Sequence, residues 1–362
     1  MKIPKALQVV IAMVVFEGTT CLVNQWWQSL FSGVQVENLL FSSDSQIVYG
    51  VGGDVAGLGK VYGWVWAWDT STGRLRWKTR ASKPISQEVL SPDGKSLLTS
   101  DWQCKPTIWD TATGKLRYEL QLDSQQDKQF PAYFTPDSQR IFGCFKEGIR
   151  IWNARTGARQ EFWKLPIGTT GLPQKLQFSA DGKKVLVEGI SWGDGERNGE
   201  GFLQLWDSRN GRVLKDFGKD VAISALSPSG KTVVLVYNSQ TDDSISWAKI
   251  YDVATSARKI QHPELTSLES LEFVSENSLL CKEVRGRWER NVHMPIFHWD
   301  IRTGRTKEQA EVSTEYDDYL SPNKKLKART NQGGYRNCPP LGALYNATSG
   351  KKLYDLEGLA GR

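Results

Sequence analysis

The fold of this chain is decided by the stretch LSPDGKSLLTSDWQCKPTIWDTATGKLRYEL, which spans residues 90–120. Ser91-Pro92-Asp93-Gly94-Lys95 has the composition of a tight turn, because Pro presets φ, Asp hydrogen-bonds to the backbone ahead of it and Gly tolerates positive φ. A second turn sequence, Thr113-Gly114-Lys115, follows Trp109-Asp110, and short apolar runs flank both turns. We therefore predict four short strands, a to d, near residues 87–91, 96–100, 107–110 and 116–120.

The same two signatures recur along the chain. Copies of the first turn begin at Ser42, Ser91, Thr135, Ser179, Ser227, Ser275 and Ser321, which are 44 to 49 residues apart. An aromatic residue followed by Asp or Asn stands at 68–69, 109–110, 152–153, 206–207, 251–252, 299–300 and 345–346. This spacing is typical of four-stranded propeller blades. We predict an all-β, seven-bladed β-propeller of four-stranded antiparallel blades over residues 34–358, with a short tail at 359–362.

Composition agrees with many short strands and argues against some functions. The 15 Trp and 33 Gly suit packed sheets joined by tight turns. The net charge of +6 comes from basic residues interspersed with acidic ones, which argues against a nucleic-acid partner. The five Cys are irregularly spaced without a CxxC pair, so no disulfide framework or zinc site is predicted. Cys144 and Cys281 lie in apolar runs and are expected in the core.

The first 33 residues predict a signal peptide or membrane anchor. Lys2 and Lys5 precede an apolar run at 6–16, as in the charged and apolar regions of a signal peptide. Gly18-Thr19-Thr20 before Cys21 loosely resembles a bacterial lipoprotein cleavage box, so Cys21 is a candidate for lipidation. The chain is accordingly expected to be exported or membrane-anchored. The alternatives are a cytoplasmic location, and an uncleaved N-terminal helix that packs on the propeller or lies along a membrane through Trp26 and Trp27.

The recurring turns and Trp-Asp pairs resemble those of the WD-repeat propellers over about residues 34 to 358. The Gly-His pair of that family is missing from every repeat, so the blades are expected to rely on Trp and aliphatic packing. The resemblance implies that partners bind at one face of the propeller.

Residues 67–77, AWDTSTGRLRW, look like one repeat of the pyrroloquinoline quinone dehydrogenase propellers, which dock their blades through a Trp at the position of Trp77. The equivalent positions here are Tyr118, Glu161, Lys215, Ile260, Glu308 and Tyr354, which predicts that this docking is not sustained. An exported enzyme of quinoprotein or glycan-active type is the alternative function. No nucleophile elbow, metal-binding helix or phosphate loop occurs, and three His offer little catalytic material, so no catalytic residue, metal or cofactor is predicted.

Loop length indicates where a partner would bind. Strand alternation places the short a–b and c–d turns at one edge of the blades, and the long segments 52–63, 188–201, 238–247, 283–295 and 331–341 at the other. Long loops on a rigid scaffold commonly carry binding residues, and aromatic and Arg residues are enriched at interaction hot spots. The candidate partner-binding residues are Trp102, Trp192, Trp247, Trp288, Tyr335, Arg287, Arg290 and Arg336, and Trp64 is a further loop aromatic.

The alternative for each loop Trp is that it folds down over the end of its own blade, as large apolar side chains often do.

The charges of these loops differ between blades. The loops of blades four and five supply acidic residues and those of blades six and seven supply Arg, which predicts a face with a negative and a positive side. These residues are Asp194, Glu196, Glu200, Asp242, Asp243, Arg285, Arg287, Arg290, Arg329 and Arg336.

The predicted function is a monomeric, non-catalytic platform that binds a protein or peptide.

Overall fold

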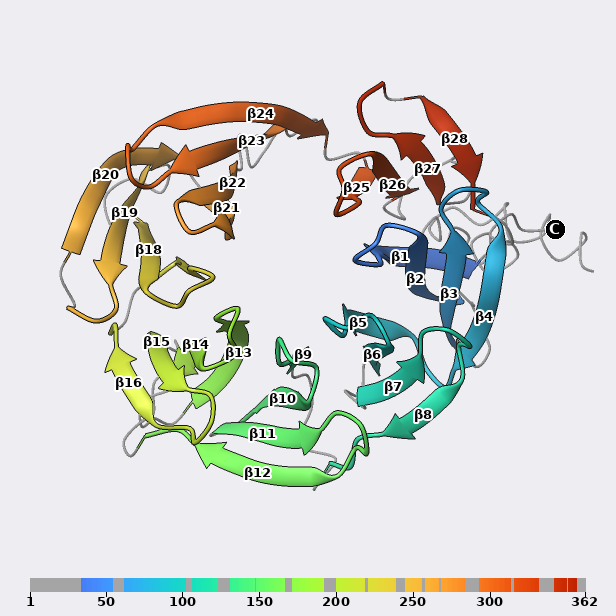
Figure 1. Cartoon of the computed structure of the whole chain (residues 1–362), viewed down its shortest axis with the longest axis horizontal. Helices are drawn as coiled ribbons and strands as arrows, with labels where there is room; N and C mark the ends of the chain where they lie inside the picture. The colour runs from blue at the N-terminus through green and yellow to red at the C-terminus, as the bar shows by residue number, and fades with distance from the viewer. Residues whose placement is uncertain are drawn as a thin grey trace, which may run out of the picture. The chain divides into compact units, whose positions relative to one another are not determined.

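The computed structural model describes residues 34–356, apart from the segments 55–61, 102–105, 123–130, 147, 167–170, 192–199, 219–220, 239–244, 256–257, 267, 284–292, 314–315, 332–341 and 350. These residues form seven four-stranded antiparallel sheets and contain no helix, so the chain is an all-β seven-bladed propeller, as predicted (Figure 1).

Each blade is listed here as its four strands in chain order. The first four blades are β1 Val34–Phe41, β2 Ile47–Asp54, β3 Gly63–Asp69, β4 Leu75–Ala81; β5 Ile85–Leu90, β6 Ser96–Asp101, β7 Pro106–Asp110, β8 Leu116–Glu119; β9 Ala132–Phe134, β10 Arg140–Phe145, β11 Gly148–Asn153, β12 Arg159–Lys164; and β13 Gly171–Phe178, β14 Lys184–Ser191, β15 Glu200–Asp207, β16 Val213–Asp216. The last three are β17 Ile223–Leu226, β18 Thr232–Asn238, β19 Ile245–Asp252, β20 Arg258–Thr266; β21 Leu268–Ser275, β22 Ser278–Glu283, β23 His293–Asp300, β24 Thr306–Ser313; and β25 Tyr316–Leu320, β26 Leu326–Asn331, β27 Ala343–Asn346, β28 Lys352–Asp355.

Every blade is built from contiguous sequence. The sheet orders run β1-β2-β3-β4 in the first blade and β25-β26-β27-β28 in the last, with no strand exchanged between them. Contiguous blades are confirmed for the described part of the chain. In the described residues, therefore, no strand pairing crosses the joint between these two blades.

Large aromatic side chains fill the spaces between sheets. Trp68, Trp152, Trp206 and Trp299, all from the Trp-Asp or Trp-Asn signature, are fully buried. One apolar cluster contains residues of the first and last blades, among them Val36 and Leu356. Each blade thus buries residues of both its faces, which is why its strands read as apolar runs rather than clean alternation.

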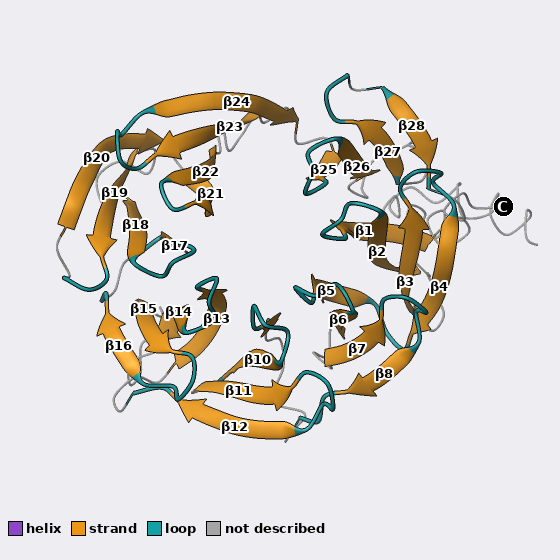
Figure 2. Cartoon of the chain, viewed as in Figure 1, coloured by secondary structure: helices purple, strands orange, loops and turns teal. Residues whose placement is uncertain are grey.

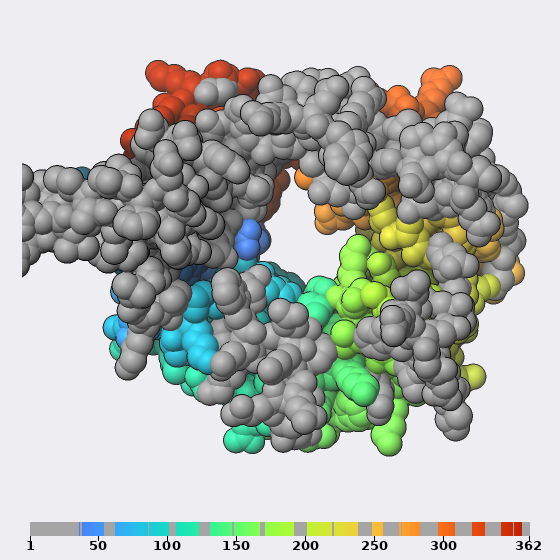
Figure 3. Space-filling view, turned by 180° about the vertical axis from the view of Figure 1, so that it is seen from behind, coloured from blue at the N-terminus to red at the C-terminus, as the bar shows by residue number. Residues whose placement is uncertain are grey.

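The contacts group the chain into two compact units. Residues 1–86 with 317–362 form one, which holds the first and last blades, and residues 87–316 form the other. Within the second unit, apolar clusters span the third and fourth blades and the fifth and sixth. In the view from behind, the described residues of blades three to five, from green to yellow, lie side by side (Figure 3).

Aromatic side chains of outer strands dock against glycines of the next blade's c–d turn. A Cβ on Gly157 would lie 2.6 Å from the Tyr118 ring, and one on Gly73 would lie 2.6 Å from Cβ of Tyr354. Both aromatics stand at the position equivalent to Trp77, since Ile108 pairs with Tyr118 as Ala67 pairs with Trp77. Docking of this kind is therefore sustained at more joints than the sequence predicts.

The third blade uses a displaced residue for the same contact. Glu161 occupies the expected position, but Trp163, two residues later, packs on Gly211 of the fourth blade, where a Cβ would lie 2.6 Å from the indole. The indole Nε1 of Trp163 donates to Glu161 at 2.7 Å, so the carboxylate holds the docking ring in place.

Candidate functional site

The candidate binding residues predicted from the sequence lie almost wholly outside the described residues. This holds for Cys21, Trp102, Trp192, Arg287, Trp288, Arg290, Tyr335 and Arg336. Trp247 lies in β19 opposite Tyr237, and its side chain is outside the described part.

Like Trp247, three further positions predicted in loops are in fact in strands. Trp64 belongs to β3, Glu200 begins β15 and Arg329 lies in β26. The sheet ladders extend beyond the apolar runs that mark them in the sequence, as the pairing of Gly53 with Gly63 shows for the first blade. The long connections between strands b and c are correspondingly shorter than predicted.

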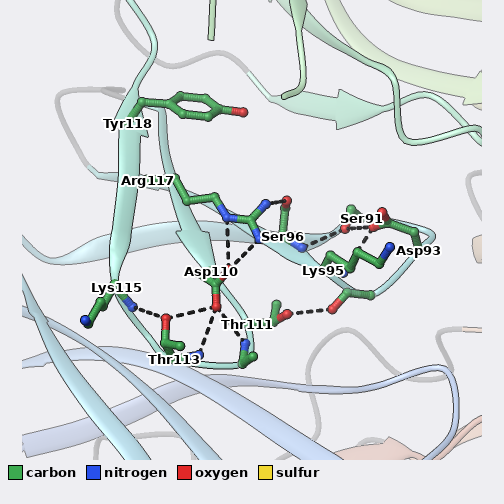
Figure 4. A network of polar contacts seen from close by, with 12 residues as sticks. Ser91, Asp93, Lys95, Ser96, Asp110, Thr111, Thr113, Lys115, Arg117 and Tyr118 are labelled. Atoms are coloured by element: carbon green, nitrogen blue, oxygen red, sulfur yellow. Dashed lines mark hydrogen bonds and ion pairs between the residues drawn. The ribbon is translucent and has the colours of Figure 1, made fainter. Parts of the chain in front are cut away.

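The a–b turns are held by a repeated set of hydrogen bonds (Figure 4). In the second blade the Ser91 hydroxyl donates to the Asp93 carboxylate at 2.6 Å and accepts from the Ser96 N–H at 2.9 Å. Asp93 also accepts from the Lys95 N–H at 3.0 Å. The same bond from hydroxyl to the residue two positions on recurs at Ser42, Thr135, Ser179 and Ser321.

The c–d turns are organised around the Asp of the Trp-Asp signature. Asp110 accepts from Arg117 Nη2 at 2.5 Å and from the Thr113 hydroxyl at 2.9 Å and N–H at 3.0 Å (Figure 4). The hydrogen bond from Arg117, with those from Thr113 and the nearby positive charge, lowers the pKa of Asp110 below its usual value. Since both carboxylate oxygens of Asp110 accept hydrogen bonds from donors of the same blade, this Asp is structural.

The two edges of the blades differ in the uniformity of their connections. The a–b connection has five residues in six blades, as at 91–95, and two in the sixth, at 276–277, while every c–d connection has five, as at 111–115. The b–c connections vary from two residues at 146–147 to eleven at 332–342. Figure 2 draws the described turns in teal. The uniform edge is thus set by turn chemistry, and the variable b–c edge is the candidate functional surface.

The structure also shows the surroundings of the Cys and His side chains in its described part. Cys144 and Cys281 are buried, which confirms their predicted place in the core, and burial raises the pKa of the Cys144 thiol far above its usual value. The Nδ1 atom of His298 lies 3.4 Å from the Ser278 hydroxyl. In the described ranges, no three His, Cys, Asp or Glu side chains gather as metal ligands would.

A search for membrane-spanning helices, confined to the same described ranges, found none of sufficient length and apolarity. Comparison with protein-family models and with curated proteins returned no match. The sheet order of the structure therefore establishes the class of the protein, a seven-bladed β-propeller.

Proposed function

We propose that this chain is a non-catalytic propeller of the broad WD-repeat kind, which binds a protein or peptide at the b–c edge of its blades. The observation that supports this best is the contrast between the two edges: all but one of the turns at one edge have five residues, and the exception has two, whereas the connections at the other edge have two to eleven residues. If the connections served only to reverse the chain, those at both edges would be short. Connections longer than the fold requires are where a rigid scaffold commonly carries its recognition residues.

The residues proposed to contact the partner are the aromatic and Arg residues of this edge. Trp and Arg contribute disproportionately to binding because they bury large areas and make several directional contacts. Opposite charges in the loops of different blades would orient a charged partner. The primary candidates are Trp192, Trp247 and Trp288.

Site-specific photo-crosslinking tests this function. A photoreactive amino acid replaces Trp192 or Trp288 in the full chain, and matched controls carry it at Lys95 or Lys183 on the turn edge. We expect the first two positions to crosslink one common protein or peptide and the controls not to do so. In a second experiment the photoreactive residue is placed at a neighbouring position of the same loop, and Trp192, Trp247 and Trp288 are all replaced by Ala. The crosslink should then be lost, while the circular dichroism spectrum still shows a β-rich fold.

One result would overturn this function, and a second would overturn only the role of the three Trp. Equal crosslinking from both edges would show that no edge is specialised. If the triple Ala variant unfolds in urea at much lower concentration than the wild type, the three Trp are structural covers of their blades. The single-site crosslinks then still report whether the edge contacts a partner.

We further propose that the N-terminal segment directs export or membrane attachment. Its support is the charged and apolar pattern of residues 2–16. Deleting residues 1–20 should leave a folded chain in the cytoplasm, whereas the full chain should fractionate with the membrane or the exported proteins. A lipid on Cys21, seen by mass spectrometry, supports the lipoprotein form, and an intact Met1 on a soluble cytoplasmic chain overturns the proposal.

A further inference from the structure

The outermost strand of the first blade, β4, carries a stripe of basic side chains. Arg74, just before the strand, and Arg76, Lys78 and Arg80 within it are all exposed, and they alternate with half-buried residues. Side chains two apart in a strand lie on one face, so the stripe faces one way along the whole length of β4. Figure 1 shows β4, in light blue, as the outermost strand of its blade.

The charge of this strand sets it apart from its counterparts. Each of the other outermost strands, β8, β12, β16, β20, β24 and β28, contains at least one Asp or Glu. β4, with the sequence LRWKTRA, contains none. Charged side chains, Lys above all, keep a sheet edge from pairing at random. An edge whose charges are all of one sign repels strands of that sign but can pair with a strand of the opposite sign.

Aromatic rings of the first blade hold two of these cations in place. The Lys78 Nζ lies 4.0 Å from the centroid of the Trp64 ring, and the Arg80 guanidinium lies 3.2 Å from that of Tyr62. Cation–π contacts of this kind reduce the freedom that a long side chain would lose on binding. They also occupy those ring faces, so Trp64 and Tyr62 do not offer them to stacked bases, as a single-stranded nucleic acid would require.

The backbone of the same residues faces the open edge of the sheet. The Asp69 N–H donates to the Arg74 carbonyl, so alternate residues of β3 from Asp69 direct their backbone groups toward β4. Their partners in β4 include Trp77 and Thr79. The backbone groups of Arg76, Lys78 and Arg80 therefore point the other way, toward the side on which the described part of the chain places no strand.

We propose that β4 binds an extended acidic peptide segment, which adds to the first blade as a fifth strand. Residues directly opposite Lys78 and Arg80 in the new ladder would have their side chains on the basic face, and opposite charges stabilise such pairs. Arg76 is already ion-paired, because its Nη2 lies 2.6 Å from the Asp69 carboxylate. The peptide that fits has Asp or Glu at alternate positions, two of them opposite Lys78 and Arg80. Backbone hydrogen bonds supply affinity and the alternating charge sets the register. This surface is additional to the proposed function of the b–c edge.

Fluorescence anisotropy with the full chain tests the proposal. The probe is a labelled peptide of about nine residues with Glu at alternate positions, long enough to cover the seven residues of β4. One control peptide has the same composition with its Glu in one block, and another has N-methyl groups at the residues that pair with β4. We expect each control to bind about tenfold more weakly or worse, which corresponds to roughly 1.4 kcal/mol or more.

Protein variants locate the site. Lys78→Glu with Arg80→Glu should weaken binding of the alternating peptide at least about tenfold, because it places like charges opposite one another. The matched control, Arg159→Glu with Lys164→Glu, makes the same charge change on the exposed positions of β12 and should bind nearly as the wild type does. Urea unfolding of both variants establishes that they remain folded; if the β4 variant does not, Lys78→Gln takes its place and should weaken binding severalfold.

Three outcomes would overturn the proposal. Equal binding of the N-methylated peptide would show electrostatic attraction without strand pairing. Equal loss in the β4 and β12 variants would show a response to net charge. Binding of a length-matched oligothymidylate that equals that of the peptide, and depends on Lys78 and Arg80, would assign the stripe to a polyanion rather than to a peptide.

Discussion

Buried tryptophans of the same signature differ in whether the indole N–H has a partner. The Nε1 atom of Trp109 donates to the Thr99 hydroxyl at 2.8 Å, and that of Trp206 donates to Gln204 at 3.1 Å. The Nε1 atom of Trp152, at the equivalent place in the third blade, has no partner among the described residues. A buried donor without an acceptor costs free energy, so the shape of the indole, rather than its polarity, accounts for Trp at position 152.

A double-mutant cycle on Trp109→Phe and Thr99→Val measures the value of this hydrogen bond. Each single change leaves one buried polar group unpaired, whereas the double variant removes both. We expect the double variant to be less destabilised than the sum of the singles by about 1 kcal/mol. Trp152→Phe serves as the reference for lost volume alone. Strict additivity in urea unfolding would contradict the interpretation.

The Asp residues of the c–d turns predict a dependence of stability on pH. The hydrogen bond from Arg209, together with its charge, lowers the pKa of Asp207 from 3.8 to about 2. Because the folded-state pKa is below that of the unfolded chain, the stabilisation is complete above about pH 4 and disappears as pH falls toward 2. Asp207→Asn should therefore flatten the decline in unfolding free energy between about pH 4 and 2. An unchanged slope in urea titrations would show that Asp207 does not contribute.

At the scale of elements, the joints between blades depend on aromatic rings packed against turn glycines. Gly157 has a positive φ of 71° and lies under Tyr118, whereas Gly94 has the same φ of 71° and no atom within 4 Å of the place of a Cβ. A comparison of substitutions at the two glycines therefore distinguishes the cost of backbone strain from the cost of close packing. The hydroxyl of Tyr118 also donates to the Ala154 carbonyl across this joint.

Gly94→Ala and Gly157→Ala should differ in cost because of that contact. Each change forces an L-residue into the left-handed region, at about 1–2 kcal/mol. Gly157→Ala also displaces the Tyr118 ring, and we expect a further loss of about 1–3 kcal/mol from overpacking. Thermal and urea unfolding provide the comparison. Equal losses for the two variants would show that the docking contact adds no stability.

The turns could be predicted from the sequence because their chemistry is local. Ser91, Asp93 and Gly94 satisfy one another within five residues, and so the strand count and order follow from the sequence. The docking by Trp163 could not be predicted, because Trp163 stands two residues beyond the position that docks in the other blades, although β11 and β12 pair with the same bulge and register as those blades. Trp64 and Trp247 were wrongly placed in loops because strand ends carry no turn signal there. The chemistry of the b–c edge remains a prediction.

For the whole molecule, the contiguous blades determine how strongly each joint is held. Between the fourth and fifth blades, Gln177 donates to the Ser224 carbonyl at 2.9 Å and accepts from the Leu226 N–H at 3.1 Å. Between the last and first blades, the Asn323 N–H donates to Ser45 at 3.3 Å beside an apolar cluster. In the described residues, the joint between the last and first blades thus combines an apolar cluster with this hydrogen bond.

Hydrogen exchange should reveal this difference. We expect the amides of the first and last blades to exchange together, as one cooperative unit, before those of the third to fifth blades. The ordering follows from the hydrogen bonds across the joint at Gln177. Mass spectrometry of peptides from β2, β10, β18 and β26 provides the measurement. Exchange of the last blade in step with the sixth, or protection equal in all blades, would contradict it.

A propeller whose blades are each complete has no preferred place for its termini. Val36 and Leu356 belong to one apolar cluster, so a short linker joins the ends of the blade array without crossing the molecule. Opening the chain instead at 167–170, between β12 and β13, interrupts no sheet. Circular permutation at any blade boundary therefore preserves every strand pair within the blades.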